Sequence, residues 1–109
     1  MSGSESADLA KVASGVQDSV STEMERVVRR WHQLPLDRAL SAAPGVHVVV
    51  QSIADEVADS CGAPRRPVPD LGPAILMDQL RVMVFDHHLE GLDSGVLARR
   101  LADLRRSLP

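Results

Sequence analysis

Apolar residues recur at intervals of three and four along most of this 109-residue chain, and this spacing restricts its fold more than any other feature. Such spacing places side chains on one face of an α-helix, whereas a half-buried strand alternates at every second residue. The first stripe comprises Leu9, Val12, Val16, Val20, Val27, Trp31 and Leu34. The pattern predicts an all-α protein, a single small bundle of four to five helices.

The N-terminal part of the chain leaves one question open. Residues 1–6 are small and polar, which predicts a disordered tail before a single helical domain at residues 7–109. Within the first stripe Thr22 is followed by Glu25, a spacing typical of a capping box at a helix start. Residues 7–33 are therefore either one long helix or two helices in tandem, and Pro35 ends the helical stretch in both cases.

The segment after Pro35 holds the main ambiguity in fold class. Residues 36–43 are expected to form a short helix that Pro44 and Gly45 close. Val46–Val50 is β-branched, and a strand there would make the protein α+β. The apolar spacing favours a helix that ends at Gly62, with Cys61 as a small core residue. The stripe of this helix comprises Val46, Val49, Val50, Ile53, Val57 and Cys61.

Two further helices are expected after a Pro-rich connector at residues 63–73. The first begins at Pro73, which suits a first helical position, and runs to about Leu89. It is apolar on most of its circumference, as in a central helix surrounded by several neighbours. Gly91 ends it, and Asp93 caps the last helix. The stripe of the last helix comprises Val96, Leu97, Leu101, Leu104 and Leu108.

Composition argues against several classes of function. The chain has one Trp, one Phe and no Tyr, although aromatic rings usually line small-molecule pockets and stack on single-stranded nucleic acid. A formal net charge of −3 gives no overall attraction to phosphate. No local motif assembles a nucleophile, an acid and a base, and no glycine-rich phosphate loop is present. We therefore expect a protein that is not an enzyme and uses no cofactor.

The compartment is predicted from three features of the sequence. Cys61 is the only cysteine, which excludes an intrachain disulfide and suits a reducing environment. The first residues lack the basic start of a signal peptide, and no apolar run approaches the ~20 residues of a membrane span. We expect a cytoplasmic protein without membrane contact. Its preference for Arg over Lys is typical of a bacterial, GC-rich genome.

The helix after Pro73 carries two groups of charged or titratable residues. Zinc ligands on a helix share one face at i and i+4, whereas the adjacent His87 and His88 diverge by about 100°. A helix-end histidine pair favoured by the helix dipole is the simpler interpretation, so we expect no metal. Asp78 and Arg81 lie one turn apart on an otherwise apolar helix. They form an exposed ion pair, a buried pair or a patch that faces a partner.

Surplus apolar surface is the main indication of function. Val, Leu and Met lie on several helix faces of a short chain, and such faces often pair with a partner helix or a symmetry mate. We expect a non-catalytic protein–protein interaction or assembly module, with a homodimer as the oligomer. The expected surface comprises Val12, Val16, Val20, Met77 and Val84.

A nucleic-acid-associated regulator is the alternative hypothesis. It would use the connector arginines and the C-terminal arginines, and its expected phosphate contacts are Arg65, Arg66, Arg99 and Arg106. Two more arginines, Arg100 and Arg105, flank the leucine stripe, so the C-terminal cluster faces several directions and is more simply a solvated flank. A helix-turn-helix across residues 36–57 is excluded, because its second helix would present valines and carboxylates to DNA.

Overall fold

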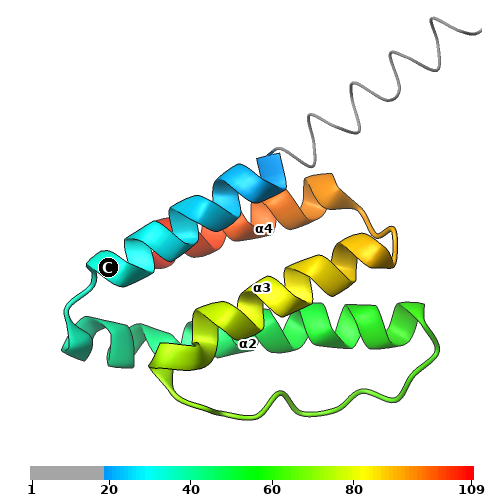
Figure 1. Cartoon of the computed structure of the whole chain (residues 1–109), viewed down its shortest axis with the longest axis horizontal. Coiled ribbons are helices and arrows are strands. Elements are labelled where there is room, and N and C mark those ends of the chain that lie inside the picture. Colours follow the sequence, from blue (N-terminus) through cyan, green and yellow to red (C-terminus); the bar gives the residue numbers. More distant parts are fainter. Residues whose placement is uncertain (1–18) are drawn as a thin grey trace, which may run out of the picture.

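The computed structural model describes residues 19–109, and every regular element in this range is an α-helix (Figure 1). The first described helix covers residues 19–33. It is followed by α2 at Leu36–Ser60, α3 at Pro73–Leu89 and α4 at Ser94–Ser107. No residue between 19 and 109 lies in a strand, so the all-α prediction is confirmed. The expected tail at residues 1–6 and the expected helix start at residue 7 lie outside the described residues.

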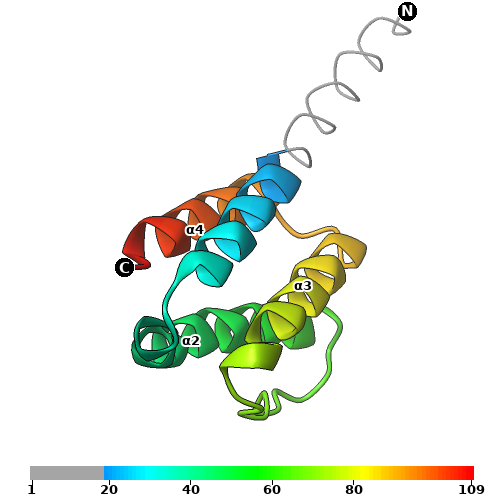
Figure 2. The same ribbon diagram turned by 60° about the vertical axis from the view of Figure 1, so that its left-hand side comes forward.

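The helices pack in two layers around a common core. In Figure 1 the first helix and α3 lie toward the viewer with α4 and α2 behind them, and Figure 2 shows the same arrangement from the side. The core is almost entirely aliphatic, and Trp31 is the one aromatic side chain among its described members. Its most deeply buried residues come from every described helix and are Val27, Val46, Val50, Ile53, Leu80, Leu97 and Leu101.

The first described helix and α2 differ from the expected subdivision. The helix at residues 19–33 passes through Thr22 without a break, so no helix begins there. α2 is one helix of 25 residues with Pro44 inside it, so the expected short helix closed by Pro44 is wrong. Pro44 is exposed, and water can therefore satisfy the carbonyl that loses its backbone donor. Burial of Ala39 and Val46 on one face, before and after the proline, holds both parts in line.

The strand alternative fails for the same helix. Val46–Val50 lies within α2, which confirms that the three-and-four spacing outweighs the β-propensity of the valines. α2 ends at Ser60, and Gly62 adopts the expected left-handed conformation with φ of 71°. Cys61 is exposed and not in the core, because the chain leaves the helix there before the stripe is completed.

The connector runs back along α2 and α3 and is held by side-chain hydrogen bonds (Figure 1). The N–H of Val68 donates to Oε1 of Gln51 over 2.7 Å, and the Val68 carbonyl lies 2.9 Å from Nε2 of His47. Nε2 of Gln79 on α3 donates to the Pro69 carbonyl over 2.9 Å. These bonds fix an extended segment that has no backbone ladder of its own.

The ends of α3 and α4 agree with the sequence-based expectations. α3 begins at Pro73 after Gly72, whose φ of 90° favours glycine. It ends at Leu89, shortly before Gly91. Oδ1 of Asp93 accepts a hydrogen bond from the N–H of Val96 over 3.1 Å, which confirms Asp93 as the cap of α4.

Candidate interaction surface

α3 buries only one side of its apolar circumference. The inward side consists of Leu76, Met77, Leu80 and His87, all buried against the core. The expected central position of this helix is wrong, because its neighbours cover this side and leave the opposite side to solvent. α3 therefore carries more apolar surface than the described bundle covers.

The outward side of α3 carries four exposed apolar side chains in a row, which we call the α3 stripe. Its members are Ile75, Val82, Phe85 and Leu89, and their exposed fractions are 39%, 52%, 59% and 66%. Separations of seven, three and four positions align them along one side of the helix. In Figure 1 α3 lies toward the viewer with no other described helix in front of it.

Charged residues interrupt and flank the α3 stripe. At about 100° per residue, Asp78 lies within the stripe, Arg81 lies along one edge and Asp86 along the other. None of these three side chains forms an ion pair with another residue between 19 and 109. Asp78 and Arg81 are exposed but do not form the i,i+3 ion pair that their spacing allows. Asp78 and Arg81 are therefore both without an ionic partner in the described part of the chain.

Two hollows border the α3 stripe. Along the Asp86 edge, a hollow of about 620 Å³ lies between α3, α2 and the connector, and apolar groups such as Val57 and Met83 line most of it. Along the Arg81 edge, a hollow of about 270 Å³ lies between α3, α4 and the first helix and includes Met24. A partner laid along the stripe would thus meet apolar surface on both sides of α3.

The surface residues expected from the sequence lie elsewhere. Met77 is buried in the core. Val20 and Val84 are half-buried, pack against the core and border the smaller hollow. Val12 and Val16 lie outside the described residues. The exposed side of α3 is therefore turned away from Met77 and Val84.

The sequence contains a signal for the α3 stripe but only a weak one for its exposure. The stripe has the same helical spacing as the inward set, which comprises the buried Leu76 and Leu80 and the half-buried Met83, and spacing alone does not say which set is covered. The one distinguishing residue is Asp78, which lies among the stripe residues, because a carboxylate rarely occupies a core position. This residue indicates the outward side of α3.

The connector arginines are engaged to different degrees. Arg65 donates two hydrogen bonds, of 3.0 and 2.7 Å, to the carboxylate of Asp59. These bonds and the charge of Arg65 lower the pKa of Asp59. Arg66 is exposed, forms no ion pair within residues 19–109, and accepts a hydrogen bond from Gln51 at its carbonyl. The connector thus leaves one of its two guanidinium groups without an acidic partner in this range.

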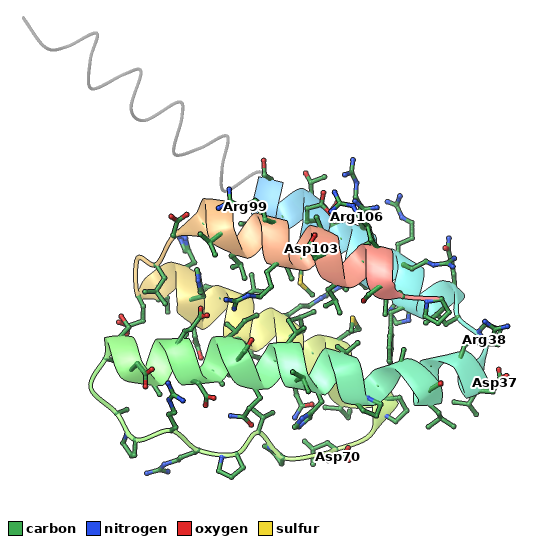
Figure 3. All side chains as sticks on the ribbon, turned by 180° about the vertical axis from the view of Figure 1, so that it is seen from behind. Asp37, Arg38, Asp70, Arg99, Asp103 and Arg106 are labelled. Carbon is green, nitrogen blue, oxygen red and sulfur yellow. The ribbon has the colours of Figure 1, made fainter. Side chains whose placement is uncertain are left out.

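The C-terminal arginines do not join the connector arginines in one basic surface. Arg106 pairs with Asp103 over 3.0 Å on its own helix. Arg99 has no such partner in the described part of the chain and lies with Arg106 along α4 (Figure 3). The connector lies along the opposite edge of the molecule from α4 (Figures 1 and 3). This separation gives no continuous track for a phosphate backbone.

Glu56, His87 and Arg100 form a polar junction where α2, α3 and α4 meet. Arg100 donates to Glu56 over 2.5 Å, whereas Nε2 of His87 lies 4.0 Å from Glu56, beyond hydrogen-bond range. His87 is 3% exposed, and its Nδ1 has no hydrogen-bond partner within residues 19–109. Burial lowers the pKa of His87. The charges of Glu56 and Asp93 raise this pKa and those of Arg100 and His88 lower it, so that the pKa lies below its ordinary value. His87 is therefore a neutral packing residue, unlike the dipole-favoured histidine expected at this helix end.

No group of three or more His, Cys, Asp or Glu side chains in residues 19–109 is arranged to hold a metal ion. No helix within the same range combines the length and apolar character needed to cross a membrane. No protein-family model, curated protein or solved structure matches this chain.

Proposed function

We propose that the protein is a non-catalytic assembly module that associates with a second copy of itself through the α3 stripe. The observation that carries this proposal is the exposure of four large apolar side chains aligned along one helix. Complete burial of one such side chain contributes about 1.5–3 kcal/mol. Even partial burial of four therefore supplies a substantial driving force for association, against which the ordering of two molecules must be set.

The use of the polar groups supports a non-catalytic role. Arg100 and Glu56 pair with each other and connect α4 to α2. The Ser60 hydroxyl donates to Glu90 at the surface, and the Cys61 thiol lies 3.6 Å from the Ala58 carbonyl. In the described part of the chain, neither nucleophile has a histidine hydrogen-bonded to it as a base.

Sedimentation equilibrium of the full chain tests the proposal. We expect the average mass to rise above 11.8 kDa as the concentration increases from about 1 µM to about 1 mM, a range that covers weak to moderate dimers. Phe85→Glu places a charge in the α3 stripe and should keep the chain monomeric throughout this range, because pairing would take the carboxylate out of water.

Val48→Glu is the matched control. Val48 is 67% exposed, comparable with Phe85, but it lies on α2 outside the α3 stripe. It should therefore leave the association of the parent chain unchanged. A parent chain that stays monomeric at all concentrations, or equal losses in the two variants, would contradict the proposal.

A further inference from the structure

The charges on the outward side of α3 are arranged so that one copy complements another. Resting on the proposed self-association, we infer that two α3 helices pair antiparallel about a two-fold axis, with Asp78 of each copy bound to Arg81 of the other. In such an isologous interface, a contact between residues i and j occurs twice. Asp78 and Arg81 form no ion pair within residues 19–109, and because they lie one turn apart on the same helix they supply both halves of that contact.

The position of Asp78 decides the orientation. Around the helix Asp78 lies between Phe85 and Leu89, about 20° from each, so pairing through the α3 stripe must bring it to the interface. A parallel pair would set Asp78 against the same residue of the second copy. Like charges held together at an interface weaken association by about a hundredfold or more. An antiparallel pair sets Asp78 beside Val82 and Arg81 of the second copy instead.

A parallel arrangement of the two α3 helices has one favourable contact, but this contact does not make it the more stable arrangement. Arg81 and Asp86 lie on opposite edges of the α3 stripe and are five positions apart, so parallel helices would bring them together across the interface. Both would remain near solvent, because Arg81 is exposed and Asp86 is half-buried. An exposed ion pair changes an equilibrium by about fivefold at most, which does not offset two facing carboxylates.

The antiparallel register also matches the apolar residues. With the axis near Gln79 and Leu80, Ile75 of one copy lies opposite Phe85 of the other, and the reverse contact follows by symmetry. Leu89 then extends over the segment that precedes α3 in the second copy, where Leu71 is itself 57% exposed. The second copy thus covers all four members of the α3 stripe. A partner without this charge pattern could cover them too, but it would leave Asp78 unpaired at the interface.

Charge reversal in the full chain tests the predicted ion pairs. Asp78→Arg alone sets an arginine against Arg81 of the second copy, and Arg81→Asp alone sets a carboxylate against Asp78, and by symmetry each like-charge contact occurs twice. Each should raise the dissociation constant by about tenfold or more. The double variant Asp78→Arg/Arg81→Asp restores both contacts in the antiparallel pair and should return the constant to within about threefold of the parent. Circular dichroism checks that all three variants keep the helical fold.

Disulfide trapping tests the orientation separately. Ile75→Cys and Phe85→Cys are made in a Cys61→Ser background, so that each chain has one thiol. Oxidised glutathione accepts the two electrons released when a disulfide forms between two such thiols, and two molecules of reduced glutathione result. Antiparallel chains form a disulfide only when the two variants are mixed. In a parallel pair each variant links to itself, and residues 75 and 85 are about 15 Å apart along the axis, too far for a disulfide.

The possible outcomes separate this inference from the proposed function. Mixed disulfides together with recovery in the double variant support the antiparallel pair. A dimer that traps as self-linked variants, or that is not restored by the double variant, overturns the orientation and leaves self-association standing. A monomeric parent chain overturns both the orientation and the self-association. The α3 stripe would then bind a different protein or residues 1–18.

Discussion

α3 and α4 follow each other directly in the chain, yet they use their apolar residues in opposite ways. α4 has one apolar face, and Leu97, Leu101 and Leu104 on that face are all buried. α3 has two apolar faces, and only the inward one is buried. The charged residues differ in the same way: Arg100 and Arg105 of α4 pair with neighbouring helices, whereas Asp78 and Arg81 of α3 have no ionic partner within residues 19–109.

This difference separates the residues that hold the bundle together from those that can bind outside it. A helix with one apolar face can satisfy that face entirely within its own chain. A helix with two apolar faces at the surface of a small bundle leaves one of them exposed. That face either binds a partner or stays in contact with water, which is unfavourable for apolar groups. Substitutions in the two helices therefore test whether α4 stabilises the bundle and α3 mediates association.

Leu101→Ala should have the largest effect on stability. Leu101 is fully buried on α4, and truncation of such a side chain costs about 2–5 kcal/mol of unfolding free energy. Leu89→Ala on the exposed side of α3 should change it by less than about 0.5 kcal/mol. Urea denaturation measures the unfolding free energy of both variants, at a protein concentration below the dimer dissociation constant. Similar losses in the two variants would remove the distinction between the helices.

His87 should make the stability of the inward side of α3 depend on pH. Its pKa in the folded state lies below its ordinary value of about 6.5, so the unfolded chain binds more protons as the pH falls. The unfolding free energy should therefore decrease on acidification below about pH 6.5, by at most about 1.4 kcal/mol per pH unit, until the folded-state pKa is reached. His87→Leu should flatten this dependence in chemical denaturation, and the exposed His32→Leu should retain it. If the unfolding free energies of the parent and His87→Leu depend on pH in the same way, His87 is not the source of the dependence.

Asp93→Ala should destabilise α4 by about 1 kcal/mol, because it removes the side chain that accepts the N–H of Val96. α3 has no side-chain cap, since its start is set by Gly72 and Pro73. Thermal unfolding measures the loss, and Arg99→Ala, at an exposed site within α4 that forms no ion pair within residues 19–109, serves as the control. An unchanged melting temperature in Asp93→Ala would show that the cap contributes nothing to the bundle.

Arg105→Ala should destabilise the bundle less than Asp93→Ala does, by below about 1 kcal/mol, because the Arg105–Glu23 pair is partly solvent-exposed. Burial raises the pKa of Glu23, but the hydrogen bond and charge of Arg105, with those of Arg26, outweigh it and lower the pKa. The stabilisation is therefore present above the unfolded pKa and is lost as the pH falls through the folded one. The difference between Arg105→Ala and the parent chain should shrink in acid; a difference that grows there would contradict this sign.

Local signals explain which parts of the fold are predictable from the sequence. Pro73, Gly91 and Asp93 each act on their own backbone, through a fixed φ, a left-handed conformation or a side-chain acceptor, so the bounds of α3 and the start of α4 follow directly. Pro44 gives the same kind of signal, but burial on both sides of it overrides the break. The burial of His87 against α2 and α4 has no local signal, because Glu56 and Arg100 come from distant parts of the sequence.

The helical class, the capping of α4 and the presence of two apolar faces on α3 follow from the sequence alone. Each of these depends on residues within a few positions of one another, and helical periodicity fixes their directions around a single axis. Which face of α3 is covered depends instead on the packing of the folded chain. The face of α3 that is covered is the one against which the first helix, α2 and α4 pack around the common core. Their positions depend on side-chain packing over the whole chain. The α3 stripe with its charges at Asp78 and Arg81 is the surface that this packing leaves exposed.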